Sequence, residues 1–380
     1  MMKLYNTLNR KLEEISVSKD GMVHIYNCGP TVYSTPHIGN LRAFVVWDVL
    51  ARALRYSGVK IKRVMNITDV GHMTSDEDWG EDKMEMAANK EGVTPLDIAN
   101  MYIYQFLKNM EQMNIQFPDG SNVKSDFDLS KLNSVNLTRA TDYVKEMIAL
   151  IEQMQKNGYV YETEQAIYFD ISKYPEYSKL SGQILEENMV AVRDEVNVDT
   201  QKKHPADFVL WMKASGFYAT HTMQWDSPWG KGFPGWHIEC SAMGGTVLEN
   251  EIDIHTGGVE HIGVHHPNER AQNFGASQKE IVKMWVHNEH LQSIEGDKLS
   301  KSKGNAYLLS DLIEKGFDPM DLRLLLAINN YRVPLKFSLD VLKNTQHTRL
   351  LLVERIKNIY AQTNEIGKVS KADFTFDKIL

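Results

Sequence analysis

A strand, a helix and a second strand follow one another near the start of the chain, and this unit constrains the fold more than any other stretch. Apolar residues predominate in Met22–Cys28 and Val59–Ile67, which predicts two strands. The segment between them, His37–Tyr56, is predicted to be a helix. Its apolar positions with helical spacing are Ile38, Leu41, Val45 and Val49. Such a β-α-β unit favours a parallel sheet with a right-handed crossover, as in nucleotide-binding α/β domains.

The turn between the first strand and the helix, Cys28–Asn40, is the first candidate site. It contains glycine and proline and ends where the helix begins, so unpaired backbone N–H groups can point at an anionic phosphate. Thr68 and Asp69 end the second strand. Because ligands in open parallel sheets sit beyond the carboxyl ends of the strands, we expect both residues near the turn. An ordinary strand–helix turn is the alternative.

Length and composition narrow the class of protein. At 380 residues the chain is long enough for two or three folded units. No stretch approaches the roughly 18 uninterrupted apolar residues of a membrane span. The N-terminus also lacks the apolar core of a signal peptide, so we expect a cytoplasmic protein with no membrane partner. The net charge of −8 does not exclude nucleic acid, because a local Lys/Arg face is enough to contact phosphates.

Four residues from three separate stretches of the sequence have the chemistry of metal ligands. His265 and Glu269 are four positions apart, so on a helix they share a face and can chelate one ion. The two cysteines, Cys28 and Cys240, could add two thiolates to that pair or be simple buried thiols. One imidazole, one carboxylate and two sulfurs would select Zn²⁺ over harder cations. His266 competes with His265 for the imidazole position.

Two further stretches are candidates for phosphate and substrate contacts. Lys298–Asn305 places small, flexible residues between lysines, whose ammonium groups could offset charge as pyrophosphate leaves. A solvated loop is the alternative. Thr256-Gly257-Gly258 would let a substrate approach the backbone closely, and a simple turn is the alternative there.

The rest of the chain alternates between predicted helices and strands. We expect a helix beginning near Thr138, then a hairpin across Glu164-Gln165 and an irregular, surface-exposed stretch from Ser172 to Thr200. Later strands are predicted at Phe208–Met212, Glu251–His255 and Val282–His287. Later helices are predicted at His237–Leu248, His266–Ser277, Ser310–Lys315, Pro319–Ile328 and Ser338–Gln362.

Taken together, these motifs resemble the class I aminoacyl-tRNA synthetases, and among them the cysteine–tRNA ligases. Pro36-His37-Ile38-Gly39-Asn40 and Lys298-Leu299-Ser300-Lys301-Ser302 are similar to the two class I signatures. Cys28–Tyr33 and Gly235–Met243 resemble stretches characteristic of the cysteine enzymes. The resemblance runs from about Leu4 to Tyr331 and is too extended and ordered to be chance.

The resemblance implies a role for individual residues. It implies one Zn²⁺ per chain and selects His265 over His266, with the ligands Cys28, Cys240, His265 and Glu269. The residues implied for the cysteine pocket are Thr68, Trp236 and His255. Those implied for ATP, which would bring Mg²⁺, are His37, Gly39, Asn40 and Lys301. The implied catalytic residues are His37, Asn40, Lys298 and Lys301.

The implied reaction has two steps. The carboxylate of L-cysteine would attack the α-phosphorus of ATP and release pyrophosphate, which is mainly a task of positioning and charge stabilisation. The cysteinyl group would then pass to the 3′-terminal ribose of tRNA(Cys). A zinc-bound substrate thiolate would exclude serine, whose hydroxyl is harder and far less acidic, without a separate editing domain.

The resemblance also implies an α/β architecture. It is a Rossmann-like parallel-sheet catalytic domain with an inserted connective subdomain and a C-terminal helical region. The expected boundaries are 1–115 and 226–305 for the two catalytic halves, 116–225 for the insertion, and 306–380 for a stem-contact region and part of an anticodon-binding bundle. We expect the chain to end within or just after the first long bundle helix, and to be a monomer.

Two rival interpretations stay open. One is a cysteine ligase of the same ancestry that acts on a small amine, as in the mycothiol pathway. The other is a non-catalytic paralogue that binds tRNA or senses cysteine. The sequence also departs from the family pattern at Gly71-His72, Glu260 and Pro267, which puts the edges of the pocket in doubt.

Overall fold

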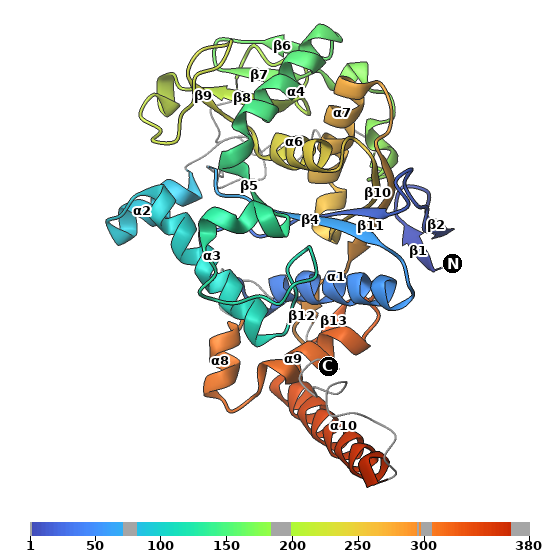
Figure 1. Ribbon diagram of the computed structural model, residues 1–380. Helices are drawn as coiled ribbons and strands as arrows, with labels where there is room; N and C mark the ends of the chain where they lie inside the picture. Colours follow the sequence, from blue (N-terminus) through green and yellow to red (C-terminus); the bar gives the residue numbers. More distant parts are fainter. Residues whose placement is uncertain (1, 71–81, 184–198, 295, 298–305, 366–380) are drawn as a thin grey trace.

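The computed structural model describes residues 2–70, 82–183, 199–294, 296–297 and 306–365, with side chains described to residue 362 (Figure 1). Its centre is a five-stranded, all-parallel sheet in the order β11-β10-β3-β4-β5. These strands are β3 (Val23–Asn27), β4 (Ile61–Ile67), β5 (Leu137–Arg139), β10 (Ile252–Gly258) and β11 (Val282–Asn288). The predicted β-α-β unit is confirmed, because α1 (Ile38–Tyr56) connects β3 to β4.

The order of the strands reverses at β3, and this reversal determines where a ligand can enter. From β3 the chain adds β4 and β5 on one side, whereas β10 and β11 lie on the other side. The carboxyl ends of β3 and β10 therefore flank a crevice of the kind in which open α/β sheets bind ligands. Cys28 directly follows β3, and Gly258 is the last residue of β10.

Helices cover both faces of this sheet (Figure 1). Successive residues of a strand point to opposite faces. Ile25 accordingly packs in a core cluster with Trp47 of α1, whereas Tyr26 packs in another with Ile238 of α6 (Trp236–Val247). Helix α7 (His265–Ser277) contacts α6 on that second face. The two cysteine-bearing segments and the start of α7 thus lie on the same side of the sheet.

One sequence prediction is wrong at the edge of this sheet. Residues 137–139, where we expected the start of a helix, form strand β5 beside β4, with Leu137 opposite Met65 and Thr138 opposite Asn66. The helix α4 begins only at Val144, after a 3₁₀ turn. A three-residue edge strand has no periodicity of its own, and the burial of Leu137 depends on a distant neighbour. This strand lies inside the segment 116–225 that we expect to be the insertion.

A second sheet of four antiparallel strands lies beyond α4 (Val144–Lys156) (Figure 1). Its strands are β6 (Val160–Glu162), β7 (Ala166–Phe169), β8 (Phe208–Lys213) and β9 (Gly232–Pro234), which confirms the predicted hairpin across Glu164-Gln165. The expectation of a surface-exposed stretch from Ser172 holds for only part of its described residues, because Tyr174, Tyr177 and Leu180 are buried between exposed neighbours. Tyr177 there is buried under α7, and its hydroxyl donates to Asn268 (2.5 Å).

The remaining elements surround these two sheets. An N-terminal hairpin, for which the sequence offered no prediction, consists of β1 (Lys3–Asn6) and β2 (Lys11–Glu14). The other helices and strands are α2 (Lys83–Glu91), α3 (Pro95–Gln112), β12 (Leu291–Gln292), α8 (Leu309–Glu314), α9 (Pro319–Ile328), β13 (Leu335–Lys336) and α10 (Leu339–Glu365). The 3₁₀ helices are η1 (Leu129–Val135), η2 (Ala140–Tyr143), η3 (Ile171–Lys173), η4 (Tyr177–Lys179), η6 (Gly216–Tyr218) and η7 (Val259–Ile262).

A buried ion cluster joins α1 to α9. Asp48 of α1 is fully buried and accepts hydrogen bonds from Arg323 of α9 (2.7 Å) and from Arg52 one helical turn away (2.8 Å). Its other oxygen accepts the backbone N–H of Gln116 (3.0 Å), at the end of α3. The cluster therefore fixes three segments that are distant in the sequence.

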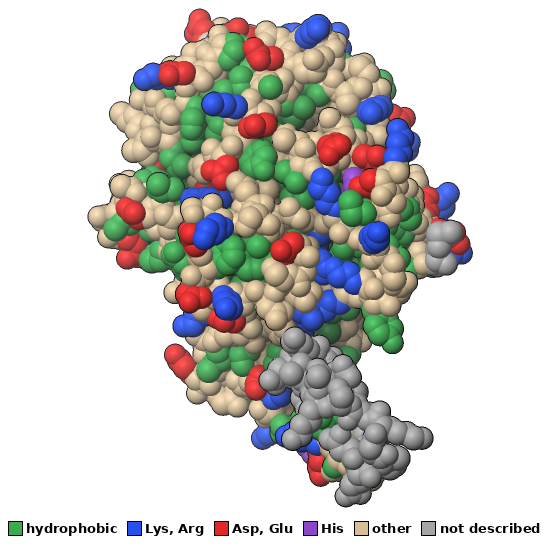
Figure 2. Space-filling view, in the orientation of Figure 1, with side chains coloured by type: hydrophobic (Ala, Val, Ile, Leu, Met, Phe, Trp, Pro, Cys, Tyr) green, Lys and Arg blue, Asp and Glu red, His purple; other side chains and the backbone are tan. Residues whose placement is uncertain are grey.

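The surface of the molecule carries both signs of charge (Figure 2). On the face shown, Lys and Arg side chains gather over α1 and the neighbouring edge of the central sheet, while acidic side chains are scattered over the rest. This local basic area occurs although the net charge of the chain is −8. Among the described residues, none of the helices combines the length and the apolar character that crossing a membrane requires.

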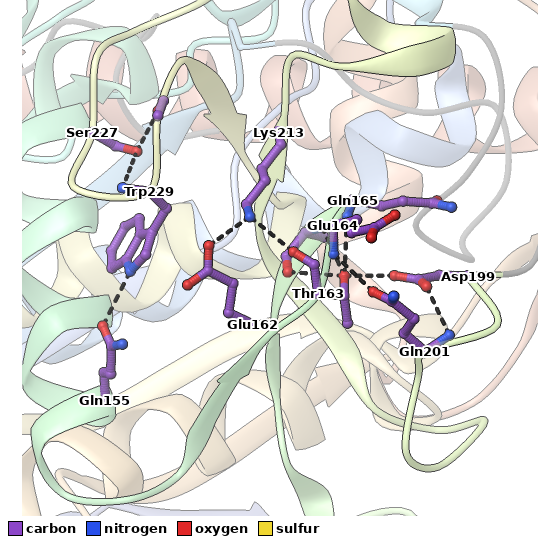
Figure 3. Close-up of polar contacts among 12 residues, drawn as sticks. Gln155, Glu162, Thr163, Glu164, Gln165, Asp199, Gln201, Lys213, Ser227 and Trp229 are labelled. Carbon is purple, nitrogen blue, oxygen red and sulfur yellow. Dashed lines mark hydrogen bonds and ion pairs between the residues drawn. The ribbon is translucent and has the colours of Figure 1, made fainter.

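Polar contacts connect the end of β8 to the end of β6, and the turn around Trp229 to α4 (Figure 3). Lys213 donates to the Glu162 carboxylate (2.5 Å) and to the Thr163 carbonyl (2.8 Å). The indole N–H of Trp229 donates to Gln155 of α4 (3.1 Å). The last of these bonds holds the turn around Trp229 against α4.

Candidate active site

The four metal-ligand candidates from the sequence meet in one buried cluster. Cys28 follows β3, Cys240 lies in α6, and His265 and Glu269 lie in the first turns of α7. Their sulfur, nitrogen and oxygen atoms all lie within 4.8 Å of one another, and all four residues are buried. Two sulfurs, one imidazole and one carboxylate at this spacing fit Zn²⁺, which takes four such ligands. The fold thus brings together residues from three separate elements.

A second set of possible ligands overlaps the first. Cys28, His255, His266 and Glu269 also place their ligand atoms within 4.8 Å of one another. His265 Nε2 lies 2.9 Å from Glu269 Oε1, and His266 Nε2 lies 3.8 Å from the same oxygen. The geometry therefore allows either His265 or His266 to supply the imidazole ligand, and the spacing in the sequence left the same two candidates. Only the first set contains both thiolates, the donors that most strongly favour a soft metal over a hard one.

The far sides of these imidazoles are held by other histidines. His265 Nδ1 lies 2.7 Å from His237 Nδ1, and His266 Nδ1 lies 2.8 Å from His287 Nε2. The hydrogen-bonded chain continues from His287 Nδ1 to the Thr7 hydroxyl (2.8 Å). Such outer contacts fix the orientation and the tautomer of a ligating ring.

Sequence reasoning missed three histidines around the cluster. His237 lies in α6, His261 in η7 and His287 in β11. His237 and His287 are buried, and His261 is partly exposed. No spacing connects them, because each comes from a different element. The sequence offered one signal, a high local density of histidine between residues 255 and 290, which includes His261 and His287 but not His237.

Burial and mutual contact shift the pKa values of the cluster. Burial and the neighbouring Cys240 raise the pKa of Cys28 well above its usual range. The hydrogen bond from Cys28 lowers the pKa of Cys240 to about 6, against the effect of burial. The two thiols therefore share one proton near neutral pH.

The imidazole and the carboxylate form the second coupled pair. Burial alone would lower the pKa of His265, but the charge of Glu269 and the contacts with Cys240 outweigh it and raise the pKa to about 10. Burial alone would raise the pKa of Glu269, yet the charges of His255 and His265 hold the pKa of that carboxyl well below its usual range. His265 is thus positively charged and Glu269 negatively charged when no metal is bound.

The residues implied for the amino-acid pocket lie beside the cluster. The ring of Trp236 stacks on His265 with 4.5 Å between centroids, and His255 Nε2 contacts Glu269 Oε2 at 2.6 Å. Thr68, at the end of β4, is buried and donates its backbone N–H to the Pro30 carbonyl (3.0 Å). Thr68 therefore supports the turn that follows Cys28.

That turn requires glycine at position 29. A Cβ atom there would lie 1.7 Å from the backbone oxygen of Asn66, a contact that no side chain can make. The Asn66 side chain also accepts the N–H of Gly29 (2.8 Å). The close approach of β3 and β4 at their carboxyl ends thus determines where Cys28 lies.

A cavity of about 580 Å³ extends from Cys28 to the start of α1. His37, Gly39 and Asn40 line it, as do His261 and Glu289 from the other side. His37 caps α1 by accepting the N–H of Gly39 at its Nδ1 (3.0 Å), and Asn40 accepts the N–H of His37 (3.1 Å). The structure therefore places three of the four residues implied for ATP, His37, Gly39 and Asn40, at the N-terminus of a helix that points into a cavity, an arrangement that favours anions.

The predicted lysines Lys298 and Lys301 lie outside the described residues. The chain that follows them reaches the start of α1, because Ile38 donates its N–H to the Tyr307 carbonyl (2.9 Å) and His37 forms a backbone bridge with Leu308. Residues 307 and 308 therefore lie against the start of α1.

Comparisons of the sequence with a family model and with known proteins point to the same family. Residues 14–347 match the family described as "tRNA synthetases class I (C) catalytic domain". The Cysteine–tRNA ligase of Treponema denticola is 43% identical over 355 residues, which cover 93% of this chain and 68% of that protein. The Cysteine–tRNA ligase of Zymomonas mobilis is 39% identical over 367 residues, with 96% of this chain and 66% of that protein covered.

Solved structures show the same fold at low identity. A Mycobacterium tuberculosis methionyl-tRNA synthetase bound by methionyl-adenylate matches with a TM-score of 0.60 and 15% identity, over 88% of this chain and 71% of that chain. The expected class I architecture is thereby confirmed for the fold as a whole.

Proposed function

The chain belongs to the cysteine–tRNA ligase family of class I tRNA synthetases, and on that premise we propose that it activates L-cysteine with ATP and transfers it to tRNA(Cys). The observation that carries the proposal is the convergence of Cys28, Cys240, His265 and Glu269 beside a cavity that ends at the N-terminus of α1. One end of this arrangement suits a thiol substrate and the other suits a polyphosphate. We place the reaction in the cytoplasm.

The metal cluster supports recognition of the substrate sulfur. When bound, Zn²⁺ would supply a soft Lewis acid for the thiolate of cysteine and discriminate against the hydroxyl of serine. Cys28, Cys240, His265 and Glu269 would hold it. A pocket that relied on shape alone would separate such near-isosteres by only about 10–200-fold.

The remaining residues divide between the two substrates. Trp236, Thr68 and His255 border the cluster and would orient the amino acid so that its carboxylate faces the cavity. His37, Gly39 and Asn40 would bind the phosphates of ATP through the start of α1. This arrangement lets the carboxylate attack the α-phosphorus while pyrophosphate departs toward the helix N-terminus.

Lysine side chains complete the proposed charge stabilisation. Lys298 and Lys301 would approach the phosphates and offset the charge that develops on the leaving pyrophosphate, with Mg²⁺ as its partner. The cysteinyl group would then pass to the 3′-terminal adenosine of tRNA(Cys). The basic area over α1 in Figure 2 supports contact with a polyanion.

The proposal is tested by cysteine-dependent exchange of pyrophosphate into ATP, followed by charging of tRNA(Cys). We expect exchange with cysteine, far weaker exchange with serine, and charging of tRNA(Cys). An absence of exchange with cysteine would refute the ligase assignment. Exchange without tRNA charging would instead favour a small-amine acceptor.

A further inference from the structure

Arg42 is a buried arginine of α1 whose hydrogen bonds all go to backbone carbonyls. It lies in the same first turns of α1 as Asn40, and its side chain is 1% exposed. Its guanidinium donates to the carbonyl oxygens of His290 (2.5 Å), Val333 (2.7 Å) and Asn330 (3.2 Å). Burial lowers its pKa to about 10, against the effect of the Glu289 charge, so it keeps its positive charge at neutral pH.

The two segments whose carbonyls accept from Arg42, residues 288–291 and 330–333, are also hydrogen-bonded to each other. Residues 288–291 form one wall of the cavity, and residues 330–333 lie between α9 and β13. Glu289 donates its N–H to the Tyr331 carbonyl (2.7 Å), and Leu335 donates its N–H to the His290 carbonyl (3.1 Å). The cavity wall and the C-terminal segment therefore form one hydrogen-bonded unit, and Arg42 connects this unit to α1.

We propose that Arg42 is a positioning residue for ATP, which fixes the distance between the start of α1 and the cavity wall at residues 288–291. The inference rests on the proposed use of this cavity for ATP. A nucleotide that contacts both walls binds well only if their separation is constant, because a site held in its binding geometry spares the cost of ordering it when the ligand binds.

Arginine suits this position better than lysine does. The guanidinium presents several donors in a rigid, planar fork, so one side chain can reach three carbonyls from two segments. The ammonium of lysine is a compact point charge on a flexible stem. Arg42→Lys would therefore keep the charge and lose the connection between the segments.

The test compares Arg42→Lys with Arg55→Lys in the full chain. Arg55 lies in the last turn of the same helix and donates to the Pro118 carbonyl (2.9 Å), away from the cavity. The primary readout is the dissociation constant of ATP from equilibrium dialysis, with bound zinc and the dissociation constant of cysteine as further readouts. We expect Arg42→Lys to weaken ATP binding about tenfold or more, with zinc content and cysteine binding unchanged. Arg55→Lys should leave all three within about twofold.

A rescue experiment separates positioning from general folding. Arg42→Ala should regain ATP affinity when guanidinium ion is added at a non-denaturing concentration, and Arg55→Ala should show no such response. Equal ATP affinity of wild type and Arg42→Lys would overturn the inference. So would Arg42→Lys failing to fold while Arg55→Lys folds. ATP binding without cysteine-dependent exchange would refute the proposed function and leave the positioning role of Arg42 supported.

Discussion

His237 Nδ1 lies 2.7 Å from His265 Nδ1 in the buried interior of the site. One of these two nitrogens must carry the hydrogen. On its other side, His265 Nε2 lies 2.9 Å from Glu269 Oε1, within the metal-ligand cluster. A metal on His265 Nε2 would require the proton on Nδ1, so His265 would donate to His237. His237 thus offers the acceptor that the tautomer of a ligating His265 needs.

We expect His237→Phe to weaken zinc binding by about 10–100-fold, because the ring of His265 would lose the acceptor that fixes its tautomer. Competition with a chromophoric chelator measures the affinity. His347→Phe, at an exposed position of α10, serves as the control and should bind zinc like the wild type. Unchanged affinity in the His237 variant would show that the contact has no role in metal binding.

Four single variants distinguish the two possible ligand sets. Cys240 and His265 belong only to the first set, whereas His255 and His266 belong only to the second. We expect Cys240→Ser and His265→Gln to lose most bound zinc, and His255→Gln and His266→Gln to retain it. Metal analysis of the purified variants gives the answer. The reverse pattern would assign the metal to the second set.

Zinc binding at pH 7 should release about two protons, because the ligands bind as thiolates and neutral imidazole. One proton is shared by Cys28 and Cys240, and the other is held by His265, whose pKa is raised to about 10. Zinc affinity should therefore rise as pH increases from 6 to 8. Calorimetry in buffers of different ionisation enthalpy counts the protons, and a count near zero would contradict this assignment.

Asp48→Asn should destabilise the protein by about 3–5 kcal/mol, because it leaves the buried Arg323 without its charged partner. Urea denaturation followed by circular dichroism measures the loss. The control is Asp128→Asn, which removes an exposed pair with Lys131 (3.5 Å) and should have a much smaller effect, because solvent screens that pair. Equal effects of the two variants would mean that the Asp48 cluster contributes little.

The pair between His221 and Asp82 predicts a pH-dependent stability. His221 Nε2 lies 2.6 Å from Asp82, the residue that caps α2, and its ring stacks on Phe233 of β9. Burial alone would lower the pKa of His221, but the hydrogen bond and charge of Asp82, together with Glu85, outweigh it and raise the pKa. The contribution to stability is therefore full below the ordinary pKa of about 6.5 and is lost as the pH rises through the higher folded value.

We expect the stability difference between wild type and His221→Gln to be largest near pH 6 and to shrink toward pH 9. Urea unfolding at a series of pH values measures this difference. A difference that grows with pH would show that His221 is neutral in the folded protein.

Local sequence patterns were sufficient to predict the elements whose spacing of apolar or ligand residues lies within one helix. The helical spacing from Ile38 to Val49 predicted α1, and the four-residue interval between His265 and Glu269 predicted two ligands on one face of α7. Both patterns follow from the 3.6-residue period of the helix, which the sequence carries by itself. The donor chemistry of the candidate ligand set was also predictable, because residue type determines it.

Only the tertiary structure decided which distant residues meet. Strand β5 was mistaken for the start of a helix because Leu137 and Thr138 are buried by pairing with β4, which local periodicity does not report. His237 and His287 surround the site from separate elements. Arg42 finds its acceptor at Val333, a separation of 291 residues. Contacts of this kind depend on how the elements pack, so the sequence determined the ligand chemistry and the fold determined the geometry that could make it a site.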